Sequence, residues 1–207
     1  MSRSWPQPLG ESVWDLLRLG MTKADGAGAD IPVNLERLAR LIRAAEFGAG
    51  LNPAQWEAIR YLRRANRFSN SPGALARFAG ATKGTISQTV KSLLAKGYVG
   101  KQERAGQKRS VSLILTDEGV ALLENDPWER FAVACADLGA KTRRRMAKGL
   151  AELLARELQS RGSPTFGTCP SCRFYRADSE TRWCMYFDEA LTTTDITRIC
   201  VAHLPRG

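Results

Sequence analysis

Apolar residues recur every three or four positions between residues 34 and 97, which is the spacing of one face of an α-helix. This pattern predicts a first helix that starts at Asn34 and ends at Gly48. A second start signal comes after it, because Asn52 can cap a helix, Pro53 suits its first position and Gln55 completes a capping box. The first half of the chain is therefore predicted to begin with two consecutive helices.

Two shorter helices are predicted next. Ser71 and Pro72 repeat the order of a capping residue followed by proline, and Thr82 can cap the helix after that. Gly97 stands where the second of these helices needs a left-handed residue to end. A short helix followed closely by an amphipathic one is the sequence pattern of a helix-turn-helix.

After Gly97 the apolar period changes from 3.6 to 2, which predicts a β-hairpin. Its first strand opens at Tyr98, its second covers residues 110–115, and the tip over residues 102–109 is polar and basic. The fold class expected is therefore mainly α with a small β-hairpin, a winged helix-turn-helix flanked by dimerisation helices.

Helical patterns continue from Thr116 to about Glu124, from Pro127, and from Ala140 to Arg161. The last of these helices has an apolar stripe that suits a dimer interface. Its members are Met146, Leu150, Leu153, Leu154 and Leu158. Three parts of the chain are expected: a flexible N-terminal segment (1–30), a winged-helix and dimerisation domain (31–161) and a cysteine-rich module (162–207). Residues 23–30 of the first part are expected to form a linker.

The predicted winged helix offers two sets of DNA-binding candidates. The open face of the helix after Thr82 enters the major groove, where Gln88 suits adenine and Lys91 suits guanine or phosphate. The candidates on this helix are Lys83, Thr85, Ser87, Gln88 and Lys91. The basic wing suits a narrow minor groove, and its candidates are Arg104, Lys108 and Arg109.

Charge supports a polyanionic partner, and the scarcity of histidine disfavours several classes of enzyme. The chain has 31 Lys plus Arg against 21 Asp plus Glu, a net charge of +10 and a pI near 9.8. No apolar run approaches the ~18 residues of a membrane span, and no signal peptide is visible, so we expect a cytoplasmic protein without a membrane partner. The single histidine, His203, disfavours Ser-His-Asp and Cys-His catalysis, and we expect a protein that is not an enzyme.

Four of the five cysteines lie within the last 39 residues, a pattern typical of metal or redox chemistry in a reducing compartment. Cys169, Cys172, Cys184 and Cys200 are the predicted ligands. A structural zinc site usually has two close pairs, whereas only one pair exists here, so we expect a [4Fe-4S] cluster, with Zn²⁺ as the alternative. A thiol switch without metal stays open, as does a ligand role for His203. Cys135 is expected to be a small core residue.

The run from Ala81 to Val99, the basic wing after it and the Leu115-Thr-Asp-Glu-Gly119 sequence resemble the MarR (multiple antibiotic resistance regulator) family over about residues 30–160. The resemblance implies a homodimer that binds double-stranded DNA at near-palindromic operators, with dimerisation through the first and last helices and a possible small-molecule effector. Arg109 matches the arginine of the family's Asp-x-Arg wing motif, but Gln107 stands where the aspartate is expected.

Together these features predict a homodimeric, sequence-specific transcriptional regulator whose four-cysteine centre senses redox, oxygen, nitric oxide or iron status. We expect the state of the centre to reach the DNA-binding lobes through the long helix after Ala140. Three alternatives stay open: a regulator of a small aromatic ligand with a structural zinc, a metal-dependent redox enzyme, and a basic architectural or RNA-binding protein.

Overall fold

The structure is a computed structural model that describes residues 26–47, 50–104, 107–179 and 181–206. The chain divides between Arg43 and Ala44 into two compact units. The predicted winged helix and the cysteine-rich segment both belong to the second unit. Residues 1–25, including most of the predicted N-terminal segment, lie outside the described residues.

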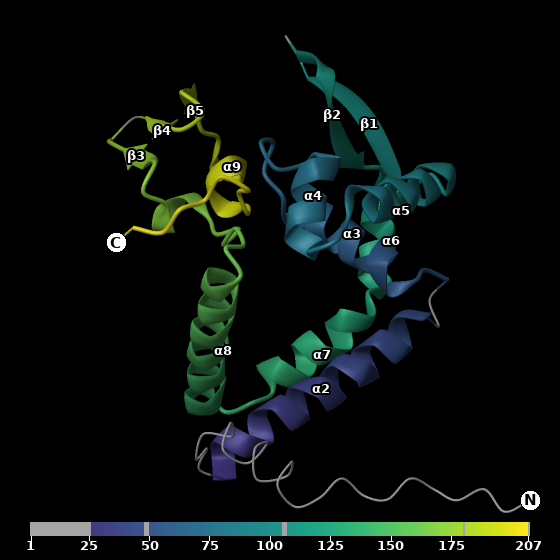
Figure 1. The fold of residues 1–207 in the computed structure, drawn as a ribbon, viewed down its shortest axis with the longest axis vertical. Helices are drawn as coiled ribbons and strands as arrows, with labels where there is room; N and C mark the ends of the chain where they lie inside the picture. The colour runs from purple at the N-terminus through teal and green to yellow at the C-terminus, as the bar shows by residue number, and fades with distance from the viewer. Residues whose placement is uncertain (1–25, 48–49, 105–106, 180, 207) are drawn as a thin grey trace, which may run out of the picture. The chain divides into compact units, whose positions relative to one another are not determined.

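Helices dominate the described chain, with one two-stranded and one three-stranded antiparallel sheet (Figure 1). The elements in chain order are α2 (Gly26–Phe47), α3 (Pro53–Arg64), α4 (Pro72–Ala79), α5 (Lys83–Ala95), β1 (Val99–Arg104), β2 (Gln107–Leu115), α6 (Asp117–Leu122), the 3-10 turn η1 (Leu123–Asn125), α7 (Pro127–Ala136), α8 (Ala140–Ser160), the 3-10 turn η2 (Cys169–Ser171), β3 (Tyr175–Ala177), β4 (Arg182–Cys184), β5 (Glu189–Ala190) and α9 (Thr193–Thr197).

The helix starts predicted by capping signals are confirmed. The Asn52 side chain accepts a hydrogen bond from the Gln55 backbone N–H at 2.9 Å, and the Gln55 side chain accepts one from the Asn52 backbone N–H at 3.1 Å. Ser71 caps α4, and Thr82 caps α5. These residues fix where α3, α4 and α5 begin, and so which face of each helix meets the core.

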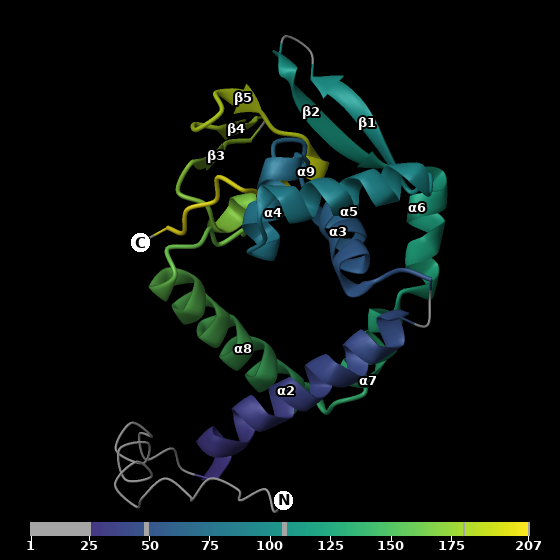
Figure 2. The same cartoon turned by 45° about the vertical axis from the view of Figure 1, so that its right-hand side comes forward.

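The wing is joined to the helices through the Leu-Thr-x-x-Gly sequence. Strands β1 and β2 form the hairpin seen in Figure 2. The Thr116 hydroxyl donates a hydrogen bond to the Gly97 carbonyl at 2.6 Å and accepts one from the Gly119 N–H at 3.1 Å. A Cβ at position 119 would lie 2.1 Å from the Tyr98 carbonyl oxygen, which explains the glycine at this position.

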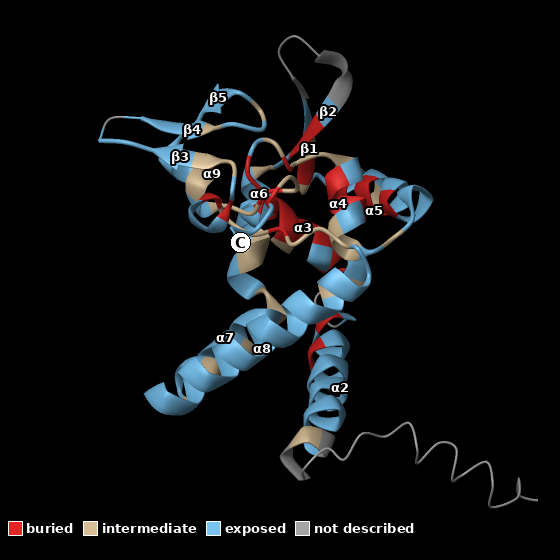
Figure 3. Ribbon diagram, turned by 60° about the vertical axis from the view of Figure 1, so that its left-hand side comes forward, coloured by how far each residue is buried: buried red, intermediate tan, exposed pale blue. Residues whose placement is uncertain are grey.

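The core of the second unit lies among α3, α4, α5 and the base of the hairpin (Figure 3). Trp56, Ile59 and Tyr61 of α3 are fully buried, and Leu93 and Leu113 pack with them from α5 and β2. The buried polar atoms of the aromatic residues are paired, since Trp56 Nε1 donates to the Glu46 carbonyl and the Tyr61 hydroxyl donates to the Ser69 carbonyl. This core places α5 with its other face toward solvent.

Helices α7 and α8 contribute no buried residue to the described single chain (Figure 3). Cys135 on α7 is half-buried, so it is not the core residue that the sequence predicted, because α7 packs too little of its surface. The predicted apolar stripe of α8 is largely exposed. Its exposed members are Met146, Leu150, Leu153 and Leu154.

One predicted boundary needs correction. The linker expected at residues 23–30 is helical from Gly26 onward, although Pro32 within the helix has no N–H to donate. These residues extend an existing helix, which avoids the cost of a new nucleus. The expected end of the long helix holds, since α8 covers Ala140–Ser160. Among the described residues, none of the helices has the length and hydropathy of a membrane span.

Candidate nucleic-acid surface and cysteine cavity

The open face of α5 has the composition that was predicted for it. Its buried side is formed by Ile86, Val90 and Leu93, together with Thr89, whose hydroxyl donates to the Thr85 carbonyl at 3.1 Å. All five predicted contact residues, Lys83, Thr85, Ser87, Gln88 and Lys91, are exposed. The helix therefore presents amide, hydroxyl and ammonium groups that suit base edges and phosphates.

The wing supplies a second basic element beside α5. Its backbone forms an antiparallel ladder in which Lys101 pairs with Leu113, and the Lys101 side chain is exposed. The predicted contact residues Arg104, Lys108 and Arg109 lie on the outer part of the two strands, and their side chains fall outside the described set. The backbone places them at the end of the hairpin away from Gly97.

The structure brings the four clustered cysteines to one cavity. Cys169 lies in η2, Cys172 directly follows it, Cys184 ends β4 and Cys200 follows α9. The cavity is small, with a volume of about 10 Å³. Its lining consists of the four cysteines and apolar or aromatic residues: Cys169, Cys172, Phe174, Tyr175, Cys184, Tyr186, Leu191, Cys200 and Ala202.

Burial affects the protonation of the Cys169 thiol. It is the main cause that raises the pKa of Cys169 to about 12, and the neighbouring Cys200, Cys184 and Cys172 contribute to the increase in that order. A negative charge on Cys169 is therefore disfavoured both by burial and by the other three cysteines. Within the described ranges, no three His, Cys, Asp or Glu side chains are grouped as the ligands of a single metal ion.

His203 does not line this cavity. Its Nδ1 lies 2.5 Å from the Thr165 hydroxyl and its Nε2 lies 2.9 Å from the Ser171 hydroxyl, so both ring nitrogens are paired. Burial lowers the pKa of His203. A Cβ at position 167 would lie 2.5 Å from the imidazole ring, so Gly167 is what lets the ring pack there. The arrangement is that of a buried, hydrogen-bonded structural histidine.

The cysteine-rich segment is built onto the loop between α3 and α4. The Ile199 N–H donates to the Arg64 carbonyl at 2.9 Å, and the Asn66 N–H donates to the Ile199 carbonyl at 3.0 Å. The Val201 N–H then donates to the Ser69 hydroxyl at 2.8 Å. The residues next to Cys200 on both sides are thus bonded to residues 64–69.

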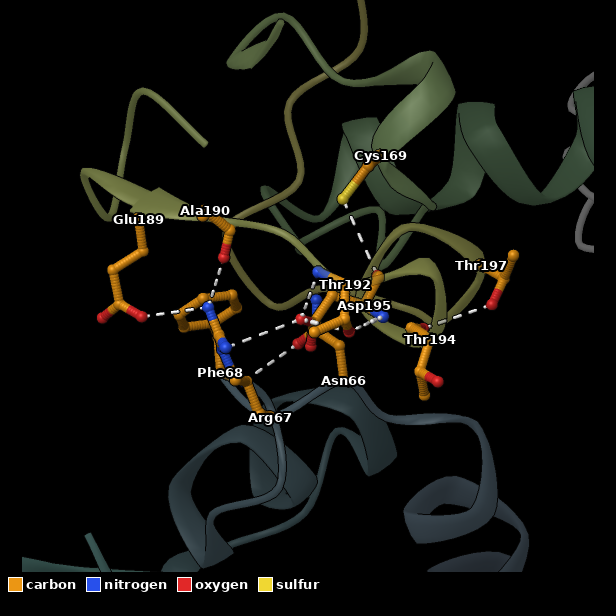
Figure 4. Close-up of polar contacts among 10 residues, drawn as sticks. All are labelled: Asn66, Arg67, Phe68, Cys169, Glu189, Ala190, Thr192, Thr194, Asp195 and Thr197. Atoms are coloured by element: carbon orange, nitrogen blue, oxygen red, sulfur yellow. Dashed lines mark hydrogen bonds and ion pairs between the residues drawn. The ribbon is translucent and has the colours of Figure 1, made fainter. Parts of the chain in front are cut away.

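Arg67 and Phe68 extend this contact with side chains (Figure 4). The Arg67 guanidinium donates to Glu189 Oε2 at 3.0 Å and to the Ala190 carbonyl at 2.6 Å, and it lies 3.7 Å from Asp195 Oδ2. Phe68 stacks on Phe187 with ring centroids 4.2 Å apart. The polar sequence of this loop contains no periodic pattern, so sequence reasoning did not identify it.

Phe166 packs the start of the cysteine-rich segment against α3 and α4. It is only 7% exposed, and its ring meets Phe78 edge-on at 5.2 Å and Tyr61 at 6.0 Å between centroids. Its backbone is left-handed, with φ of 49°, which is uncommon for a residue other than glycine. A buried aromatic residue in such a conformation indicates that packing holds it there.

The same loop holds the helix-turn-helix and the wing. Ser71 caps α4, and the Leu113 N–H of β2 donates to the Asn70 carbonyl at 2.6 Å. The sequence predicted that the cysteine-rich segment acts through the long helix, here α8. The described contacts instead lead from Ile199 and Val201 directly into residues 64–70.

Comparisons with known proteins agree with this fold. The sequence model of the MarR family matches residues 49–110. An HTH-type transcriptional repressor, YetL of Bacillus subtilis (strain 168), is 34% identical over 77 residues, which are 37% of this chain and 46% of that protein. The chain thus matches about half the length of this curated relative.

Two solved structures give the same picture. A MarR transcriptional regulator from Methanosarcina mazei Go1 superposes with a TM-score of 0.51 at 21% identity over 63% of this chain and 98% of that one. NadR in complex with 4-hydroxyphenylacetate gives 0.51 at 24% identity over 64% and 95%. Residues 49–110 therefore match the MarR family, and the described chain has the winged-helix fold of these solved MarR-type structures.

Proposed function

We propose that this protein is a homodimeric, sequence-specific DNA-binding transcriptional regulator whose affinity for its operator depends on a metal centre held by four cysteines. The observation that carries the proposal is the position of the cysteine cavity. Its lining residues continue directly into bonds with the loop that precedes α4 and α5.

DNA binding is supported by the exposed face of α5 and by charge. Lys83, Gln88 and Lys91 lie on a helix that the core holds with its polar side outward. The net charge of +10 favours a polyanion. A second copy of the chain would bury the exposed apolar stripe of α8 and present two recognition helices to a near-palindromic site.

The donor set of the cavity fits a [4Fe-4S] cluster in its chemistry. Four thiolates are the usual ligands of such a cluster, and the aromatic lining, including Phe174 and Tyr186, supplies an apolar surrounding. Structural zinc sites usually draw their ligands from two close pairs of cysteines. This cavity takes one close pair, Cys169 and Cys172, and two isolated cysteines, which favours the cluster over zinc.

When bound, the cluster supplies a group that oxygen, nitric oxide or iron shortage can alter or remove. The chain's own part is to convert that change into geometry. Cys200 lies between Ile199 and Val201, whose backbone bonds fix Arg64, Asn66 and Ser69. If Cys200 no longer binds the centre, Ile199 and Val201 are held less firmly in place. Their hydrogen bonds to the loop before α4 then weaken.

The test begins with anaerobic purification, a visible absorption spectrum and analysis of iron, sulfide and zinc. Operator duplexes are selected from a random pool with the loaded protein, and affinity is then measured by fluorescence anisotropy with and without the centre. We expect a change of about 5–150-fold, the usual range of allosteric coupling. Cys184→Ser should abolish the centre and this change, whereas Cys135→Ser is the matched control that keeps both. Equal affinities of loaded and unloaded protein would refute the regulatory role.

A further inference from the structure

Asn66 has a side-chain amide with one unsatisfied end. The residue is 1% exposed, and among the described residues its Nδ2 is the buried side-chain polar atom without a hydrogen-bond partner. Its Oδ1 accepts from the Phe68 N–H at 3.1 Å and from the Ser69 hydroxyl at 2.8 Å. Because both partners are donors, the oxygen is identified without ambiguity, and Nδ2 is the group directed to the other side.

Cys200 lies between two residues that are hydrogen-bonded to Asn66 and Ser69. The Asn66 backbone N–H donates to the Ile199 carbonyl, so Asn66 contacts the residue that directly precedes Cys200. On the other side of the cysteine, the Val201 N–H donates to the Ser69 hydroxyl, which itself donates to Asn66 Oδ1. Asn66 and Cys200 are therefore held next to each other by hydrogen bonds on both sides of the cysteine.

Ser69 has no proton left for the sulfur. It has a single hydroxyl hydrogen, which goes to Asn66 Oδ1, and its oxygen accepts from the Val201 N–H. The free donor at this site is therefore Asn66 Nδ2. A neutral thiol is a weak acceptor, whereas a metal-bound thiolate carries negative charge and accepts strongly.

We propose that Asn66 Nδ2 donates an N–H···S hydrogen bond to the Cys200 sulfur when that sulfur ligates the metal centre, and that this bond both raises the centre's reduction potential and ties the centre to the helix-turn-helix. The proposal rests on the proposed function, since it requires Cys200 as a ligand. Hydrogen bonds to cluster sulfurs are among the factors that set the potential, and they favour the more negative, reduced state.

The bond also provides a path for regulation. Asn66 begins the loop that ends in the Ser71 cap of α4 and that holds β2 through the Asn70 carbonyl. Loss of the centre leaves the amide buried without an acceptor, so the loop gains by rearranging. Asn66 is thus a positioning residue that senses the ligand state from within the DNA-binding part of the chain.

The test uses the full chain with its centre loaded anaerobically, and the variant Asn66→Asp. Aspartate keeps an oxygen for Phe68 and Ser69 but replaces the donor with an oxygen that repels the thiolate. At a fixed solution potential, we expect the ratio of reduced to oxidised cluster to fall about tenfold, which is about 59 mV for a one-electron couple. Asn52→Asp is the matched control, because the same chemical change at the cap of α3 keeps the acceptor that Gln55 needs.

Far-UV circular dichroism checks that each variant is folded. If Asn66→Asp fails to fold, Asn66→Ala removes the donor without adding charge and should shift the ratio in the same direction by a smaller factor. A loaded, folded variant with the wild-type ratio overturns the role of Asn66 and leaves the proposed function intact. A wild-type protein that holds no centre on the four cysteines overturns both. If the wild type holds zinc, the cluster is refuted, and equal rates of zinc loss to a chelator from wild type and Asn66→Asp overturn the role of Asn66.

Discussion

Replacing Phe166 with alanine should release the cysteine-rich segment from the winged helix. The ring is 7% exposed and contacts Phe78 and Tyr61 edge-on, so it resembles a core aromatic residue. Removing such a ring costs about 3–5 kcal/mol, including the lost aromatic contacts. Alanine keeps the strain of the left-handed backbone, so this strain cancels in the comparison with wild type.

Hydrogen exchange measures this cost locally. The Ile199, Val201 and Asn66 N–H groups are the reporters, because their hydrogen bonds form only while the segment is docked. With 1.4 kcal/mol per factor of ten, a loss of 3–5 kcal/mol lowers their protection by roughly 100- to 4,000-fold, up to the full free energy of docking.

A second variant, Phe166→Gly, separates packing from backbone strain. Glycine loses the same ring but accepts a φ of 49° at no steric cost, which returns about 1 kcal/mol. We therefore expect the reporter N–H groups to be protected from exchange at least as well in Phe166→Gly as in Phe166→Ala. Unchanged protection at Ile199 and Val201 in Phe166→Ala would refute the view that this ring anchors the segment.

Three other changes test separate parts of the structure. Gly119→Ala should cost about 2 kcal/mol or more in thermal unfolding, since its Cβ meets the Tyr98 carbonyl, whereas Gly73→Ala in α4, with nothing within 4 Å, should stabilise by about 0.5–1 kcal/mol. Because burial lowers the pKa of His203, its contribution to stability is complete above the unfolded value near 6.5 and is lost as the pH falls below it. His203→Gln should reduce the difference in melting temperature between pH 7.5 and pH 5.5, and an identical difference would contradict this. Gln88→Ala should weaken binding to the selected operator by about 1–3 kcal/mol and relax preference at one position per half-site, and unchanged discrimination in anisotropy would mean that another residue reads that base.

The parts of the fold that could be predicted from the sequence are those determined by residues close to one another along the chain. Asn52, Ser71 and Thr82 each cap a helix through the residue three positions later, so the sequence alone locates the starts of α3, α4 and α5. The exposed face of α5 follows from its 3.6-residue period. The cysteines could be predicted to share a site because four of the five lie within the last 39 residues.

The docking of the cysteine-rich segment could not be predicted in this way. Arg67 and Asn66 look like ordinary loop residues, and their partners lie more than 120 positions further along the chain. Phe166 lies between Gly162 and Gly167, where composition indicates a linker rather than a buried anchor. Strands of two or three residues, such as β3 and β5, are too short to show alternation.

The bond between Ser69 and Val201 has a consequence for how the protein is made. The two residues are 132 positions apart, so at 5–20 residues per second the ribosome needs roughly 7–26 s between them. During that interval α3, α4 and α5 can assemble, but the loop at residues 64–69 lacks its partners. A newly made chain therefore passes through a stage in which α5 is present without the contacts that residues 199–201 make with this loop. The order of synthesis thus leaves the loop before α4 without these hydrogen bonds until the last of these parts is translated.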